Sequence, residues 1–375
     1  MRLKSRIIRH IAVTATSFAV VAFFVVVTLN LSILNPIATA LEDFSITDIY
    51  YQMFDATSQP RESKLVTIVD MSELKARRDL GQSIRDIESL NPKVLSLDMV
   101  FEGLKEDTVG DNMLMDIAEE YSNIVYSYKL LKYVKGQYTK EVHSFFTPFI
   151  PVEEGFTNFE RKLYGGIKRE LSVGQKSQGE VKPSFALLTA NKYAGSEVIP
   201  LEDRQMGINF IPTSFSEISY KEVLSHPELI TDRIVLFGAT MEESDMHYTP
   251  LGRMPGVELQ AYSVETILQQ KEIKTLSIWQ IAILSFIIVL LTELIQAAYE
   301  NWIERRKSRI VRFFGATEIS LTILTFFLMI LWLTVFFVVF YLWRYSVNLG
   351  WAFSGMVFLD NSRQFYDTFI KTISK

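Results

Sequence analysis

The chain has 375 residues, of which 49% are hydrophobic and 22% are charged, and its formal net charge is −5. This acidic balance argues against nucleic acid as a partner, because phosphate binding calls for a basic surface. The sequence contains no cysteine, which excludes a disulfide framework and thiolate chemistry. Apolar residues gather at the two ends of the chain, and the middle has an ordinary polar balance.

The first hydrophobic segment, residues 11–34, carries no charge and is long enough for a bilayer core, which takes about 20 apolar residues. Basic residues crowd residues 1–10, and the charges that follow the segment are first acidic. The positive-inside rule therefore places residues 1–10 in the cytoplasm and the next part of the chain outside. A cleaved signal peptide is the alternative, because Ala38 and Ala40 form a small-x-small site. The apolar core is long for a signal peptide, so we favour an uncleaved anchor.

Residues 40–274 alternate between short apolar runs, typical of buried strands, and segments with helical spacing. The β-α-β-α-β order predicts an α/β domain with a mostly parallel sheet and helices on both faces. An alternating segment, residues 167–173, predicts a strand of an antiparallel hairpin inserted into this domain. Strands are predicted at residues 65–70, 93–98, 124–128, 207–211 and 233–237, and helices at 83–90, 111–121, 183–195 and from about residue 255.

Six segments of the middle domain form a familiar series: LVTIVDMS (65–72), KVLSLDMVFE (93–102), GFTNF (155–159), PSFALLTA (183–190), INFI (208–211) and RIVLFGATMEESDMHYTPLGRMPGVELQAYSVETIL (233–268). In this order they resemble the CHASE domain of type two, an extracellular sensory domain of bacterial signalling proteins. The resemblance implies a membrane layout with one helix before the domain and about three after it. Members usually carry a downstream cyclase, kinase or phosphatase, whereas this chain ends at Lys375 without an output domain. A histidine frequent in the last helix of the domain is Gln260 here, which puts a binding role for that position in doubt.

Three further hydrophobic stretches predict transmembrane helices at residues 276–296, 319–343 and 345–360. A basic loop, residues 297–317, separates the first two and marks the cytoplasmic side. The last stretch is short, so residues 345–375 could instead lie on the outer surface as an amphipathic segment. We expect four crossings, a cytoplasmic tail at residues 361–375, and a place in the bacterial inner membrane with the large domain outside.

Three acidic residues, Asp70, Asp98 and Asp245, fall at or beyond the ends of predicted strands. Ligands of open α/β sheets bind outside the carboxyl ends of the strands, so these acids are candidate ligand-binding residues. Arg169 is a candidate counter-charge, because the resemblance extends to its GGIKR segment. The alternative, which we favour, is that the acids only cap loops. In that case Asp98→Asn or Asp245→Asn should cost about 1–3 kcal/mol.

Other polar groups give weaker signals. Glu242, Glu243, Asp245 and His247 have the residue types of metal ligands, but such a loop is more often solvated, and we expect neither a metal nor a cofactor. Glu293 and Glu318 are expected to reach the membrane interface from helix ends. The sequence contains no HExxH, GxSxG or Walker-type motif, so we expect a protein that is not an enzyme.

Two functions remain open. The first is a sensor whose outer domain binds a small ligand or a periplasmic protein and whose helices pass the signal to a separate signalling protein. The second is an accessory subunit that docks in an envelope complex without sensing a ligand.

Overall fold

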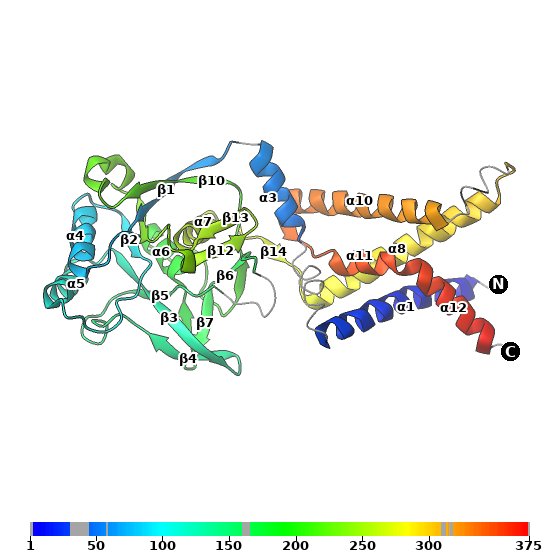
Figure 1. Ribbon diagram of the computed structural model, residues 1–375, viewed down its shortest axis with the longest axis horizontal. Helices are drawn as coiled ribbons and strands as arrows, with labels where there is room; N and C mark the ends of the chain where they lie inside the picture. Colours follow the sequence, from blue (N-terminus) through cyan, green and yellow to red (C-terminus); the bar gives the residue numbers. More distant parts are fainter. Residues whose placement is uncertain are drawn as a thin grey trace. The chain divides into compact units, whose positions relative to one another are not determined.

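The computed structural model describes residues 3–30, 45–57, 59–159, 166–308, 313, 315 and 318–373. The chain divides into two compact units (Figure 1). The outer unit is Tyr51–Ile273, and the helical unit combines Met1–Tyr50 with Lys274–Lys375. The predicted cleavage site at residues 38–40 and the end of the first hydrophobic segment lie outside the described residues, as does part of the basic loop.

The outer unit is built on a sheet with nine described strands in the order β10-β1-β11-β2-β3-β4-β7-β8, with β5 also pairing with β3. Neighbouring strands from β10 to β3 are parallel, which confirms the predicted α/β class with a mostly parallel sheet. Hairpins β3–β4 and β7–β8 add the antiparallel part. These strands are β1 (Arg61–Asp70), β2 (Val94–Leu97), β3 (Ile124–Val134), β4 (Gln137–Val142), β5 (Glu154–Phe156), β7 (Gly174–Ser177), β8 (Glu180–Pro183), β10 (Thr213–Ser219) and β11 (Ile234–Gly238).

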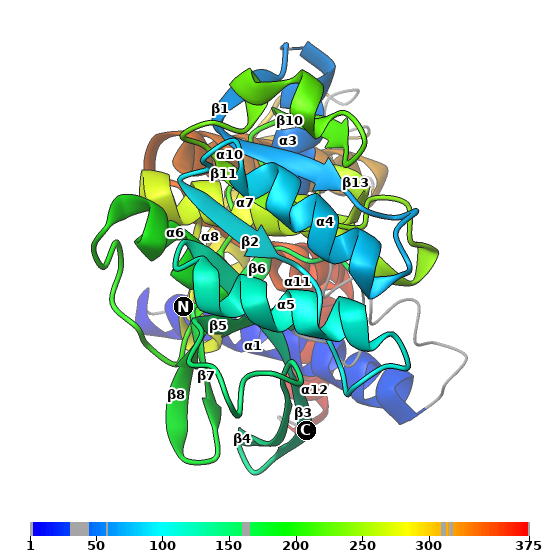
Figure 2. The same cartoon turned by 90° about the vertical axis from the view of Figure 1, so that its left-hand side faces the viewer.

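Helices cover both faces of the sheet, as Figure 2 shows: α4 (Arg77–Glu88) and α5 (Thr108–Glu120) on one face, α6 (Phe185–Ala194) and α7 (Gly256–Gln269) on the other. The apolar side of α4 repeats at helical spacing, and Leu80, Ile84 and Ile87 enter the core. β1 is buried continuously from Val66 to Asp70, because both faces of the parallel sheet are covered.

Two sequence predictions shift in this unit. The predicted strand at 207–211 is replaced by β9 (Gln205–Gly207) and β10, with Pro212 between them. The amides of Ile208 and Asn209 donate to the Arg169 carbonyl and to Thr266 Oγ1 instead of a strand ladder, so the strand does not continue past Gly207. The alternating segment 167–173 does form a strand, β6 (Glu170–Ser172), but this strand pairs antiparallel with β9 instead of forming a hairpin. Short 3-10 turns complete the unit at Val223–Ser225, Pro227–Leu229 and Glu243–Asp245, and β12 (Met246–Thr249) pairs with β13 (Gly252–Pro255).

In the helical unit, three of the described helices are long and apolar enough to cross a membrane. They are α1 (Leu3–Asn30), α8 (Ile278–Glu304) and α10 (Glu318–Trp343), with candidate spans at Arg6–Phe24, Ile278–Glu304 and Ile319–Trp343. α3 (Ile46–Thr57) runs across the boundary between the units. The start of α8 and the end of α10 are tied by β14 (Lys274–Thr275) and β15 (Tyr345–Ser346).

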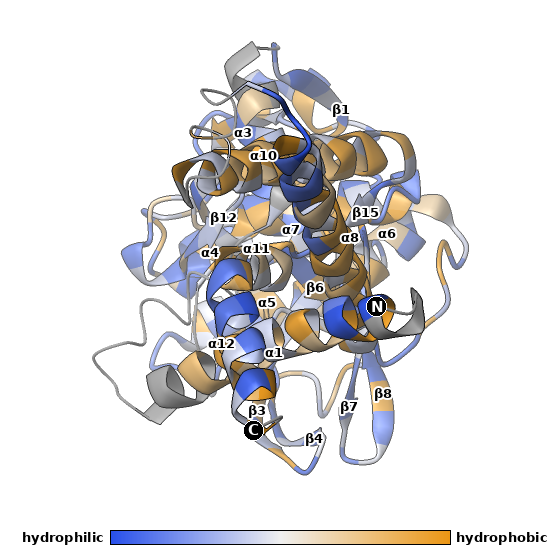
Figure 3. Cartoon of the chain, turned by 90° about the vertical axis from the view of Figure 1, so that its right-hand side faces the viewer, coloured by the Kyte–Doolittle hydropathy of each residue, from blue (hydrophilic) through white to orange (hydrophobic). Residues whose placement is uncertain are grey.

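The predicted fourth span divides between β15, α11 (Gly350–Val357) and the start of α12 (Leu359–Ile373). Figure 3 shows apolar residues along α8 and α10, whereas α12 carries many polar ones. The fourth crossing therefore stays a prediction. Glu318 begins α10, as expected for a helix end, but Glu293 is fully buried in the helical unit instead of reaching a surface.

Candidate functional site

The carboxyl ends of β1, β11 and β2 lie side by side in the outer unit. Asp70 of β1 is in register with Gly238 of β11, and Phe237 of β11 is in register with Leu97 of β2. Asp98 follows Leu97 directly, and its backbone amide donates to the Phe237 carbonyl at 2.9 Å. Two of the three predicted acids therefore occupy one edge of the sheet, where α/β proteins bind ligands.

Asp70 is committed to holding loops. Its Oδ1 accepts hydrogen bonds from the Ser72 amide at 3.0 Å, the Ser72 hydroxyl at 2.5 Å and the Thr240 amide at 3.0 Å. Burial acts to raise the pKa of Asp70, but the hydrogen bonds from Ser72 and Thr240 outweigh it and lower that pKa. Asp70 thus ties the loop after β1 to the loop after β11, as a capping residue does.

Asp98 is in the opposite situation. It is partly buried, and within the described part of the chain no side-chain hydrogen bond holds its carboxyl group. Burial raises the pKa of Asp98 to about 7, the charge of Asp245 raises it further, and Lys129 acts against both. The expected role as a buried hydrogen-bonded cap does not fit this carboxyl group. When the Asp98 carboxyl group is ionised, its burial instead destabilises the folded state.

Asp245 reaches the same edge from the 3-10 turn that precedes β12. Its carboxylate lies over Gly256, the first residue of α7, where an added Cβ would be 2.6 Å from Asp245 Oδ2. Gly238 likewise leaves room beside Asp98, since a Cβ there would be 2.8 Å from Val257 and 3.3 Å from the Asp98 Cβ. Two glycines therefore allow the close approach of the acids, the sheet and the N-terminus of α7.

Arg169 lies on the segment beside β12. Ile167 forms a parallel bridge with Tyr248, and the Ile208 amide donates to the Arg169 carbonyl at 2.8 Å. The backbone of Arg169 is thus placed near the strand that follows Asp245, and its role as a counter-charge stays a prediction.

The acidic loop at residues 242–247 separates into pairs. Glu243 pairs with Arg253, and Asp245 Oδ1 lies 3.7 Å from His247 Nε2. Among the described residues, no group of three His, Cys, Asp or Glu side chains is arranged to hold a metal ion. The pairing favours the solvated-loop interpretation.

An open cleft of about 690 Å³ lies between the loops that follow β1 and β2, and none of Asp70, Asp98 and Asp245 lines it. Met99 and Val100, which follow Asp98, line it together with Phe101 and Leu80. Lys75 and Lys105 add side-chain cations for which the described residues provide no ion-pair partner. The sequence did not reveal this cleft, because its lining joins the start of α4 to loop residues without a regular pattern.

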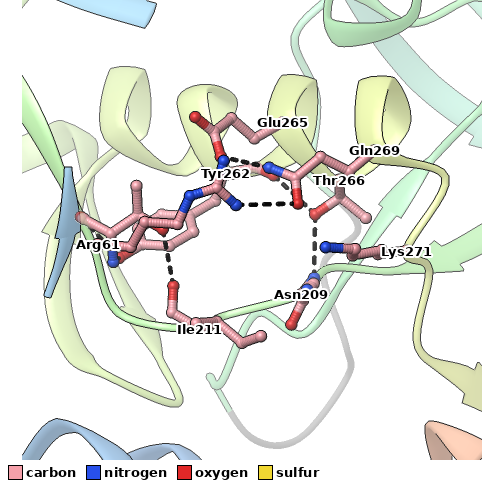
Figure 4. A pocket seen from close by; sticks show the side chains of 9 residues that line it. Arg61, Asn209, Ile211, Tyr262, Glu265, Thr266, Gln269 and Lys271 are labelled. Atoms are coloured by element: carbon pink, nitrogen blue, oxygen red, sulfur yellow. Dashed lines mark hydrogen bonds between the residues drawn. The ribbon is translucent and has the colours of Figure 1, made fainter. Parts of the chain in front are cut away.

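A second, smaller pocket of about 30 Å³ lies at the opposite edge of the sheet, between the start of β1 and the end of α7 (Figure 4). Glu265 accepts from Ser63 at 2.5 Å and from Gln269 at 2.8 Å, and Arg61 donates to Gln269 at 3.4 Å. This space holds about one or two waters. These hydrogen bonds connect the start of β1 to the end of α7.

Comparison with known proteins gives one family. The sequence model described as CHASE2 domain matches residues 19–295, which is more than half of the chain. No curated protein matches the chain, and no solved structure does.

Proposed function

This chain belongs to the CHASE2 domain family of extracellular sensory domains, and we propose that it is a sensor that binds a small ligand beside Asp98 and passes a signal through its helices to a separate partner. We also propose that it resides in the bacterial inner membrane, with its N-terminus in the cytoplasm. Three apolar helices support a membrane protein with an extracellular domain. The basic residues at 1–10 and 305–312 support the orientation.

The observation that carries the ligand-binding proposal is the Asp98 carboxyl group, which has no hydrogen-bond partner among the described residues and interacts with the charge of Asp245. A partly buried acid with a pKa near 7 and no hydrogen bond from the described residues lowers the stability of the fold. Such groups concentrate at functional sites, because a ligand supplies the missing partner. Two carboxylates close enough to repel each other favour a cationic group, so the proposed ligand carries a protonated amine. The cleft lined by Met99 and Val100, the two residues after Asp98, is large enough for the remainder of a small molecule.

The path of the signal is supported by α7. Its first turn contacts Asp245, and its last turn contributes Glu265 and Gln269 to the network with Arg61. The helix has 14 residues, so it spans about 20 Å at the usual rise. It leads in sequence through β14 into the membrane helix α8. A ligand that moves the Asp245 loop would shift α7, which is followed in sequence by β14 and then by the membrane helix α8.

Thermal unfolding of the full chain in nanodiscs, followed by tryptophan fluorescence, tests the proposal against a panel of amino acids and polyamines. We expect one amine to raise the unfolding temperature of the wild type and of Asp116→Asn, but not of Asp98→Asn. Asp116 is a matched control because it is a surface acid on α5, with a side chain 67% exposed. The proposal fails if no amine shifts the wild type, or if every shift is equal in Asp98→Asn. Either result would favour the docking subunit.

A further inference from the structure

An ion pair is buried among the helices of the helical unit. Glu293 of α8 is 0% exposed, and its Oε2 accepts from Arg363 Nε of α12 at 2.7 Å and lies 2.5 Å from Arg363 Nη2. The other oxygen, Oε1, lies 3.1 Å from Nδ1 of His10 on α1. The Glu293 carboxylate therefore connects α8 to two helices far away in sequence, α1 and α12.

The remaining donors of Arg363 are also occupied. Nη2 donates to Gln296 Oε1 at 2.7 Å, and Nη1 lies 3.3 Å from both Glu300 and Asp360. Gln296 in turn donates to Thr325 of α10 at 2.6 Å. All four long helical segments of the unit, α1, α8, α10 and α12, thus meet in a single polar network.

A second ion pair holds α12 further along. Arg9 of α1 donates to Asp367 through Nε at 3.2 Å and through Nη2 at 2.9 Å. A bidentate pair of this kind fixes orientation as well as distance. It places α12 beside the N-terminal part of α1, in agreement with Figure 1.

Apolar packing contributes little to the position of α12. The buried residues of this helix are Leu359, Ser362 and Arg363. Its large apolar side chains instead point away from the unit, with Phe365, Phe369, Ile370 and Ile373 at 63%, 52%, 45% and 67% exposure. Apart from Leu359, the buried side chains of α12 are polar, and a buried charge in such a place depends on its partner.

We propose that Glu293 and Arg363 form a charge clasp that fixes α12 against α1 and α8, so that α12 leaves this position when the clasp is broken. The clasp couples the helix that follows the outer unit to the last helix of the chain. It concerns the helical unit alone and does not depend on the proposed ligand. The role proposed for Glu293 and Arg363 is to position α12, and it involves no chemical reaction.

Spin-label distances between α1 and α12 test the clasp. The chain contains no cysteine, so Ile8→Cys and Thr372→Cys, both at exposed positions, introduce two labels without competing sites. In the full chain in nanodiscs, we expect one narrow distance distribution. We expect that distribution to be lost in Arg363→Gln and in Glu293→Gln. Arg306→Gln is the matched control, because it removes a cation that lies 3.9 Å from the centre of the Trp302 ring, outside the network of Glu293 and Arg363. This variant should keep the narrow distribution.

A charge exchange separates a clasp from a general loss of folding. The double variant Glu293→Arg with Arg363→Glu restores opposite charges and should recover at least part of the narrow distribution. An unchanged distribution in both single variants would overturn the proposal, because apolar packing would then suffice. Failure of the exchange to improve on either single variant would also overturn it, since the pairing of charges would not be the cause.

Discussion

Replacing Asp98 by asparagine is expected to stabilise the protein at pH 8 and to stabilise it less than half as much at pH 5. The pKa of Asp98 is raised to about 7 in the fold, chiefly by burial and then by the charge of Asp245. Between about pH 4 and 7 the folded state therefore binds more protons than the unfolded state, and the wild type loses stability as the pH rises through that window. Asparagine has nearly the same shape and cannot ionise, so it removes this loss.

The size of the effect follows from the pKa. A rise from 3.8 to about 7 corresponds to about 4 kcal/mol at 1.36 kcal/mol per unit. Asp98 is partly open to solvent, which screens its charge, so about 2 kcal/mol is the expected gain at pH 8. For a domain of about 150–250 residues, this gain raises the Tm by about 4–8 °C.

Asp70→Asn supplies a control of opposite sign at the same sheet edge. Asp70 has a lowered pKa because hydrogen bonds from Ser72 and Thr240 outweigh its burial. Its contribution is present above the unfolded pKa and is lost as the pH falls through the folded pKa. At pH 8 this variant should therefore lose about 1–3 kcal/mol.

Differential scanning calorimetry of the full chain at pH 5 and pH 8 measures both variants under the same conditions. The reasoning about Asp98 is refuted if Asp98→Asn is as destabilising as Asp70→Asn at pH 8. It is equally refuted if the gain is the same at both pH values, because ionisation would then play no part.

Three further outcomes are expected. His143 lies 2.8 Å from Glu154 and 2.9 Å from Glu141 through its two ring nitrogens, and the hydrogen bond to Glu154 is the largest cause of its raised pKa. The stabilisation by His143 is present below about pH 6.5 and is lost as the pH rises through the folded pKa. His143→Gln should therefore lower the Tm at pH 6 by a few degrees, about 1 kcal/mol after solvent screening, and by less at pH 9, whereas the exposed His226→Gln should leave the Tm unchanged. Equal losses of Tm at both pH values in His143→Gln would contradict this. Residues 45–274 expressed alone should fold as a soluble α/β domain, since Tyr51–Ile273 is a compact unit, and a random-coil circular dichroism spectrum would count against it. A fluorescent protein active only in the cytoplasm, fused after Lys375, should fluoresce if the chain crosses four times, whereas alkaline phosphatase activity from the same position would indicate three crossings.

The sequence by itself determined the class of the protein and much of the fold. Hydrophobic length and flanking charge are local properties, so the three long apolar helices could be predicted from them. The β-α-β order and the apolar runs that end at Asp70 and before Asp98 are local as well, and they located both acids at the carboxyl edge of the sheet. The predicted strand at 207–211 failed because the amides of Ile208 and Asn209 bond to Arg169 and Thr266, partners that the local pattern does not reveal.

Only the tertiary structure decided what each acid does. Asp70 is satisfied by Thr240, 170 positions away in sequence, whereas Asp98 meets the like charge of Asp245. Glu293 is buried because Arg363, 70 positions later, supplies its counter-charge. Burial and pairing depend on which distant segments cover a residue, and a periodic pattern carries no information about such partners. Two aspartates with the same local signature therefore acquire pKa values on opposite sides of the ordinary aspartate value. The pKa of Asp70 is lowered by hydrogen bonds, and the pKa of Asp98 is raised by burial and repulsion.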